Sequence, residues 1–239
     1  MDLEARFRDA VVHFWDARDR QAAKQREGGK IDAGTRGAVT GGTQMGAIEV
    51  LIRDILLDAG LEALDIRTST ALELPGYYRI EKKWDLLVVS RNRLVLAIEL
   101  KSQVGSFGNN LNSRVEEAIG NAADVWTAYR ENRFGTAAPQ PFLGFFFLLE
   151  DTPKVHQAVG FKEPYFQVDP VFHGASYAKR YEILCQRLVH ERLYTSACLT
   201  LSGKEPLTIT HPAPEISFTS FAAAIEGHAI TFRKSVEHL

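Results

Sequence analysis

WDLLVVSRNRLVLAIELK, residues 84–101, is the stretch of the chain that decides its fold. Two apolar runs, residues 84–89 and 94–101, are joined by the four polar residues 90–93. Apolar segments separated by a short polar turn are typical of a β-hairpin. We therefore predict two antiparallel strands with a turn centred between Arg91 and Asn92.

Three charged side chains at the open end of this hairpin form a candidate catalytic group. Asp85 on the first strand lies opposite Ile98 or Glu99 on the second, and the pattern leaves both pairings open. Glu99 and Lys101 are two residues apart, so their side chains emerge on the same face of the strand. The interpretation without chemistry is an exposed ion pair at a strand end, which contributes little to stability.

Two neighbouring carboxylates and an amine suit the hydrolysis of a phosphodiester. The acids repel each other, and they remain ionised most readily with a divalent cation between them. Oxygen ligands favour Mg²⁺, which acidifies a bound water and neutralises charge on a phosphoryl oxygen. Lys101 could orient that water or lend positive charge to the transition state. A second Glu-x-Lys sequence, Glu81-Lys82-Lys83, follows a Pro-Gly turn, and we interpret it as a solvated charge cluster.

The segment after the hairpin, residues 103–114, is a candidate nucleic-acid surface. Ser113 and Glu116 have the spacing of a capping box, which predicts a loop up to residue 112 and a helix over 113–131. The N–H groups at a helix start favour an anion, and amide or guanidinium side chains can read base edges. The candidate DNA contacts are Gln103, Asn109, Asn110, Asn112 and Arg114. The alternative is an ordinary loop of turn-forming residues.

Helix and strand patterns on both sides of the hairpin indicate an α/β fold. Apolar residues at spacings of three and four predict helices over residues 1–27, 44–61 and 175–193, with a last helix near 220–228. We predict further strands over 64–74 and 142–149, and the latter is apolar throughout, as in a strand covered on both faces. A hairpin followed by a helical crossover to a buried strand predicts a mixed central sheet flanked by helices.

Composition and charge restrict the class of protein. The 239 residues are 45% hydrophobic, which is enough for one large domain with a real core. The net charge of −2 argues against a protein that coats nucleic acid indiscriminately, although it allows a local basic cleft. Cys185 and Cys198 form no metal or disulfide pattern, so we expect two free thiols. The charged first residues and the lack of a long apolar run predict a cytoplasmic protein without a membrane span.

Several stretches, in a consistent order, make the sequence similar to a known family. The chain resembles the XhoI-type family of type II restriction endonucleases, within the PD-(D/E)xK nuclease superfamily. The resemblance is carried by residues 84–89, 99–105, 107–110, 116–120 and 126–130, with further likeness at 36–40, 148–151, 174–177 and 180–182. It implies a single domain over residues 1–239 with a restriction-endonuclease-like PD-(D/E)xK core and added helices. Its parts are an N-terminal helix and loop (1–43), a catalytic core (44–150) and a mostly helical C-terminal part (151–239).

By this resemblance, Asp85, Glu99 and Lys101 are the catalytic residues. Asp85 and Glu99 are the metal ligands, with the Leu100 carbonyl as a further candidate ligand. Trp84 stands where the superfamily motif often has proline. Two residues outside the hairpin are further candidates for the site. Glu49 matches an additional acid that many superfamily members carry on the helix before the sheet, and Arg36 is a candidate DNA contact.

The family also implies the reaction and the partners. A member is a homodimer that requires Mg²⁺ and cuts both strands of palindromic double-stranded DNA at CTCGAG, after the first C. A cognate DNA methyltransferase is expected in the same cell, within a restriction-modification system, but not as a stable partner. Two alternatives stay open: a repair or structure-specific nuclease of the same fold, and a DNA-binding protein that keeps the fold without catalysis. The intact set of Asp85, Glu99 and Lys101 argues against the second.

Overall fold

A six-stranded mixed sheet forms the centre of the computed structural model, which describes residues 2–27, 44–135 and 139–236. The strand order is β1-β4-β5-β6-β7-β8. β5, β6 and β7 run parallel, and the other neighbouring pairs are antiparallel. The strands are β1 (Ile66–Arg67), β4 (Leu86–Ser90), β5 (Arg93–Gln103), β6 (Phe142–Glu150), β7 (Ser196–Gly203) and β8 (Thr208–Thr210). The prediction of a mixed α/β sheet is confirmed.

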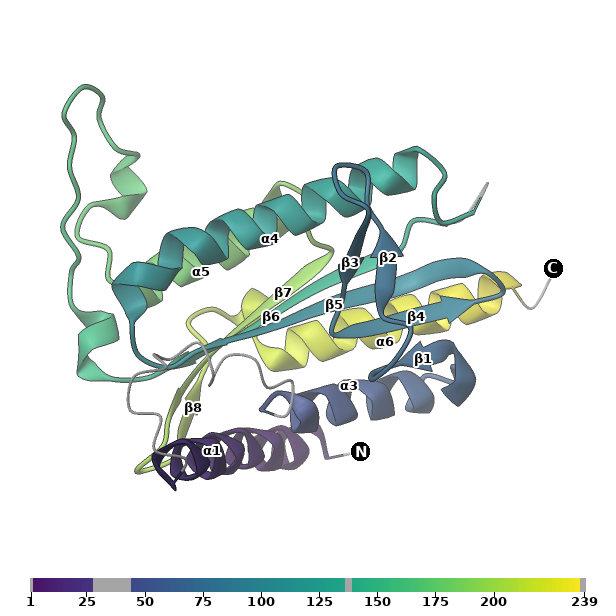
Figure 1. The fold of residues 1–239 in the computed structure, drawn as a ribbon, viewed down its shortest axis with the longest axis horizontal. Coiled ribbons are helices and arrows are strands. Elements are labelled where there is room, and N and C mark those ends of the chain that lie inside the picture. Colours follow the sequence, from purple (N-terminus) through teal and green to yellow (C-terminus); the bar gives the residue numbers. More distant parts are fainter. Residues whose placement is uncertain (1, 28–43, 136–138, 237–239) are drawn as a thin grey trace.

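Helices cover both faces of this sheet (Figure 1). One face packs against α4 (Phe107–Arg130) and α5 (Tyr177–His190), and the other packs against α1 (Leu3–Glu27), α3 (Gly46–Asp58) and α6 (Phe218–Val236). Each face therefore has its own apolar core. β6 contributes to both cores, because its first eight residues are all buried, as the uninterrupted apolar run predicted. Short 3-10 turns lie at η1 (Ala63–Asp65), η2 (Pro153–His156), η3 (Pro170–Phe172) and η4 (Pro214–Ile216).

The β4–β5 hairpin forms where the sequence predicted it. Ser90 pairs with Arg93, and the two residues between them, Arg91 and Asn92, have φ values of 49° and 59°. A two-residue turn with both residues in the left-handed region matches the natural twist of the flanking strands. The turn is thus centred as expected.

Two local predictions are wrong. The expected strand over 64–74 is divided into η1, the two-residue β1, a turn in which Ala71 has a φ of 55°, and β2 (Glu73–Pro75), which pairs with β3 (Glu81–Lys83) as a separate hairpin. The helix expected from Ser113 begins at Phe107 instead, so Ser113 lies inside it and caps nothing. Phe107 and Leu111 are buried four residues apart, which extends the apolar stripe of α4 toward its start. The strand β7 was not anticipated.

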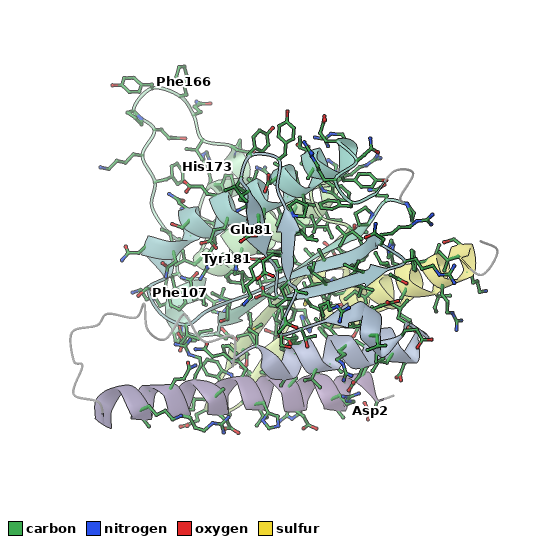
Figure 2. The ribbon with its side chains drawn as sticks, turned by 45° about the vertical axis from the view of Figure 1, so that its right-hand side comes forward. Asp2, Glu81, Phe107, Phe166, His173 and Tyr181 are labelled. Carbon is green, nitrogen blue, oxygen red and sulfur yellow. The ribbon has the colours of Figure 1, made fainter. Side chains whose placement is uncertain are left out.

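An arm formed by residues 157–176 projects beyond the ends of α4 and α5. Tyr165 and Phe166 are each 88% exposed, and Phe166 stands at the arm's far end in Figure 2. A cavity of about 460 Å³ lies between α4, α5 and the base of the arm, and its lining contains none of the candidate catalytic residues. In the described parts of the chain, no helix is both long and apolar enough to cross a membrane.

Candidate active site

The β4–β5 hairpin places Asp85 and Glu99 next to each other at its open end. Leu86 pairs with Ile98, so the next position along puts Asp85 opposite Glu99, one of the two pairings that the sequence left open. Oδ2 of Asp85 accepts a hydrogen bond of 2.7 Å from the Leu100 N–H, which fixes the carboxylate against β5. The Leu100 side chain packs in the apolar core on the other face of the sheet. This residue can therefore serve the site only through its backbone.

Glu99 is a buried carboxylate held by two lysines. It is 2% exposed, and its two oxygens are divided between two ammonium groups. Lys101 forms an ion pair with Oε1, and the Nζ atom of Lys82 lies 2.6 Å from Oε2. The interpretation of residues 81–83 as a solvated cluster is thus wrong for Lys82, whose side chain is only 12% exposed.

The electrostatics of these groups follow from burial and mutual contact. Burial raises the pKa of Asp85, and the neighbouring charge of Glu99 raises it further against the Leu100 N–H and the two lysines. Burial also acts to raise the pKa of Glu99, but Lys101 and Lys82 outweigh it and hold that pKa below its usual value. Burial acts to lower the pKa of Lys101, but Glu99 and Asp85 outweigh it and raise the pKa above its usual value. Glu99 and Lys101 therefore form a charged pair, while Asp85 lacks full compensation.

The donor atoms of this site suit a hard divalent cation. Across the described ranges, no group of three or more His, Cys, Asp or Glu side chains is arranged to hold a metal, so the protein offers the oxygen pair of Asp85 and Glu99. Mg²⁺ is commonly bound through one or two carboxylates and keeps several waters, whereas Zn²⁺ favours four nitrogen or sulfur ligands. A cation between the acids would also relieve the repulsion that raises the pKa of Asp85. The residues present fit Mg²⁺.

Comparison with known proteins identifies the family. A family model for restriction endonuclease XhoI matches residues 24–211. The chain belongs to the XhoI restriction endonuclease family. Among curated relatives, type II restriction enzyme BstVI from Geobacillus stearothermophilus is 45% identical over 209 residues, covering 84% of this chain and 93% of the relative. Type II restriction enzyme XhoI from Xanthomonas vasicola is 45% identical, covering 75% and 72%, and AbrI from Azospirillum brasilense is 46% identical, covering 70% and 75%.

No solved structure matches this XhoI-family chain. The family and its named relatives make the protein a type II restriction endonuclease, an enzyme that acts on double-stranded DNA. The sequence-based recognition is confirmed at this level. The separate roles of the site residues stay predictions.

A third acid of the XhoI-family chain, Glu49, lies within electrostatic reach of Asp85. Glu49 is on the first turn of α3 and is half-buried. Burial raises its pKa to about 7, a hydrogen bond with Thr68 opposes this shift, and the charge of Asp85 adds to it. The structure therefore places Glu49 close enough to Asp85 for their charges to interact. Its role as an additional acid stays a prediction.

The predicted DNA contacts of the XhoI-family chain fall into different environments. Asn109 and Asn112 are exposed and Asn110 is half-buried, all on the first turns of α4 and not in the loop expected there. Arg114 is half-buried and forms an ion pair of 2.7 Å with Glu117. Arg36 lies outside the described residues.

Gln103 differs from the other predicted contacts because its side chain is occupied within the protein. It is 4% exposed, its Nε2 atom donates to the Gly105 and Ser106 carbonyls, and its Oε1 atom accepts from the Tyr181 hydroxyl. These bonds join the end of β5 to α5 and to the start of α4. We therefore leave Gln103 out of the DNA surface proposed below.

Sequence reasoning missed Lys82 as a member of the site. Its partner Glu99 is 17 residues away, on a strand of a different hairpin. One signal was available in the alternation of β3, where Glu81 and Lys83 are exposed and Lys82 between them points inward. In a strand, neighbouring side chains face opposite sides, so one of three consecutive charged residues must differ from its neighbours.

Proposed function

We propose that this XhoI-family enzyme hydrolyses phosphodiester bonds in both strands of palindromic duplex DNA, with Mg²⁺ as cofactor. The proposed target is CTCGAG, cut after the first C, and the proposed active form is a homodimer in the cytoplasm. The observation that carries the proposal is the pair of acids, half-buried Asp85 and buried Glu99, with Lys101 on the same face of one hairpin. The named relatives support the restriction of DNA over a general nuclease or a non-catalytic DNA-binding protein.

In the proposed mechanism the two acids bind the metal, and the lysine acts on the attacking water or the transition state. Asp85 and Glu99 would hold Mg²⁺, with the Leu100 carbonyl as a candidate further ligand; when bound, this ion acidifies water and neutralises phosphoryl charge. The Leu100 N–H orients Asp85, and Lys101 forms an ion pair with Glu99. The Lys101 ammonium, which forms an ion pair with Glu99, would orient the attacking water or lend positive charge to the transition state.

The DNA surface is proposed around the start of α4. Asn109, Asn110, Asn112 and Arg114 lie on about the first two turns of α4, the helix that follows β5, and β5 carries Glu99 and Lys101. Amide and guanidinium groups are the side chains best suited to adenine and guanine edges. Two copies related by a two-fold axis would present this surface to the two half-sites of a palindrome.

Digestion of a sequenced viral DNA, followed by mapping of the fragment ends, tests the proposal. Discrete fragments that begin within CTCGAG only when Mg²⁺ is present would support activity, target and cofactor together. A smear would indicate a nuclease without a fixed target, and unchanged DNA would indicate a binding protein. The mass of the enzyme in solution, measured by analytical ultracentrifugation, tests the homodimer.

The variant Glu99→Ala separates catalysis from binding. The proposal expects cleavage to be abolished while sequence-specific binding, measured by fluorescence anisotropy with labelled duplexes, stays measurable. Exposed Glu81 provides the matched control, since Glu81→Ala removes an acid on the neighbouring hairpin without touching the pair. Cleavage by Glu99→Ala at the rate of Glu81→Ala would refute the assignment.

A further inference from the structure

Lys82 occupies the site without a role in the proposed chemistry. Its Nζ atom lies 2.6 Å from Oε2 of Glu99, 2.9 Å from the Lys83 carbonyl oxygen and 4.3 Å from the ring centre of Trp84. A carboxylate, a carbonyl and an aromatic face are all favourable partners for an ammonium group. Lys82 is therefore held in one place from three directions.

The contact is unlike a surface ion pair. The Lys82 side chain is 12% exposed and that of Glu99 is 3% exposed, so both charges have left most of their water. Removing one partner of such a pair strands the other charge in the interior, whereas exposed pairs contribute little. Trp84, which lies beneath the ammonium group, is 1% exposed.

The hairpin that carries Lys82 is anchored at both ends. At its base, the Trp84 N–H donates to the Leu72 carbonyl at 2.9 Å. At its tip, Asp124 of α4 accepts from the N–H groups of Tyr77 and Tyr78 at 2.8 and 2.9 Å and from Nε of Arg79 at 2.7 Å. Figure 1 shows β2 and β3 standing across the sheet beside α4, and Figure 2 shows Glu81, the first residue of β3, in front of the sheet. The anchored hairpin thus holds the Lys82 ammonium group in a fixed position.

The two lysines act on different oxygens of Glu99. Lys101 takes Oε1 and is the stronger of the two cations at Asp85. Lys82 takes Oε2 and reaches it from a separate pair of strands. The two contacts together determine the orientation of the carboxylate plane.

We propose that Lys82 is a positioning residue for DNA hydrolysis, which holds the Glu99 carboxylate in one orientation beside Asp85. It acts through Glu99 and does not contact the DNA. The inference rests on the proposed function, in which Glu99 is a metal ligand. It adds the β2–β3 hairpin to the catalytic apparatus.

Variants of Lys82 are compared with Lys83→Met, a matched change at the neighbouring exposed lysine of the same strand. Lys82→Met should lower the single-turnover cleavage rate about 10- to 100-fold, the effect typical of removing a residue that orients a metal ligand, with KM for DNA unchanged. Mn²⁺ binding, followed by electron paramagnetic resonance, should weaken by a similar factor. Lys82→Arg, which restores a cation, should recover most of both losses. Lys83→Met should change neither the rate nor the Mn²⁺ affinity.

A measurement without cleavage keeps the inference separate from the proposed function. Unfolding by urea in the absence of divalent cations is compared for Lys82→Met, Glu99→Gln and the double variant. We expect the double variant to be more stable than the sum of the single losses predicts, because Lys82→Met removes the ammonium group that Glu99→Gln leaves without its partner, while Lys101 loses its partner equally in both. This comparison applies also if Lys82→Met folds poorly, since the double variant then recovers the fold.

The outcomes distinguish two kinds of failure. If Glu99→Gln cleaves normally, the proposed role of Glu99 as a metal ligand is wrong, whatever Lys82 does. If Glu99→Gln is inactive but Lys82→Met matches Lys83→Met in rate and Mn²⁺ affinity, Lys82 has no positioning role. Additive stability losses for residues 82 and 99 would likewise overturn the inference.

Discussion

Glu99 keeps its charge in the interior because two ammonium groups oppose the effect of burial. Asp85 has no such complete compensation. The Leu100 N–H and the charges of the same two lysines act to lower its pKa, but burial and Glu99 outweigh them and the pKa stays raised. Two acids a short distance apart thus have different tendencies to bind a proton. This difference arises from their neighbours and not from their residue type.

Replacement of Lys101 tests its role as the cation of the transition state. Lys101→Met should lower the single-turnover rate by about 100-fold or more, the scale of losing one preorganised electrostatic group. Lys101→Arg keeps the charge and should lose less. DNA binding by anisotropy should be nearly unchanged in both variants. A near-normal rate for Lys101→Met would exclude the assignment.

The pKa of Glu49 predicts a pH dependence of stability in the metal-free protein. Its pKa rises from 4.5 to about 7 on folding, so the folded state binds the proton more tightly than the unfolded state does. The stability associated with this proton is present below pH 4.5 and is lost as the pH rises toward 7. Glu49→Gln, which cannot ionise, should therefore gain thermal stability relative to wild type as the pH rises from 5 to 8 in EDTA.

The matched control for this comparison is the exposed Glu81. Glu81→Gln should show no such pH-dependent gain in melting temperature. A constant difference between Glu49→Gln and wild type at every pH would contradict the raised pKa. The same experiment with Mg²⁺ shows whether the cation changes the cost of ionising Glu49.

At the scale of elements, the β2–β3 hairpin depends on one residue of α4. Asp124 accepts three hydrogen bonds from the hairpin tip, and these bonds outweigh burial and lower its pKa. Without Asp124, two backbone N–H groups and the Arg79 guanidinium lose their acceptor. The hydrogen bond between Arg79 and Asn121 would remain between the tip and α4.

Asp124→Ala should lower the free energy of unfolding by about 1.5–3 kcal/mol, the usual contribution of a hydrogen bond to a charged group. Limited trypsin digestion should cut first at Arg79, Lys82 or Lys83, because the hairpin loses its anchor. If Lys82 positions Glu99, the cleavage rate on DNA should fall as well. Wild-type trypsin patterns in the variant would show that the hairpin is held by other contacts.

At the scale of the whole molecule, the sequence predicted what local patterns can encode. The alternating apolar runs of residues 84–101 predicted a hairpin, and the two left-handed turn residues sit where the polar turn is centred. The long apolar run of β6 predicted a strand with both faces covered. Asp85, Glu99 and Lys101 could be grouped because they belong to this one hairpin.

Features that depend on distant partners could not be predicted in the same way. Lys82 acquires its role from Glu99 on a different hairpin, and three consecutive charged residues look like solvent-exposed surface until that partner is known. The start of α4 was misplaced because a capping box at Ser113 is a local signal, whereas the burial of Phe107 depends on residues of α5 such as Tyr177. β7 pairs in parallel with β6, which lies on the far side of α5 in the sequence, so that pairing is not visible in any local pattern.

The two thiols provide a reporter of global unfolding. Cys185 and Cys198 are free, as predicted, and both are fully buried in the two cores that sandwich the sheet. Burial raises the pKa of Cys198 to about 12 and that of Cys185 further, so neither forms a reactive thiolate in the folded protein. Labelling with a thiol reagent should follow the rate of whole-molecule unfolding, and fast labelling of either cysteine in native buffer would contradict this arrangement.

The corner of the molecule that holds Asp85, Glu99, Lys82 and Lys101 carries two negative and two positive groups, which cancel without any added ion. Dialysis against a chelator should therefore leave the architecture whole, in contrast to a zinc finger, which collapses when stripped. If the proposed cofactor is correct, the metal-free enzyme should keep its fold during storage and cleave DNA once Mg²⁺ is added. Under the proposed mechanism the cation would serve the reaction, and the fold would not depend on it.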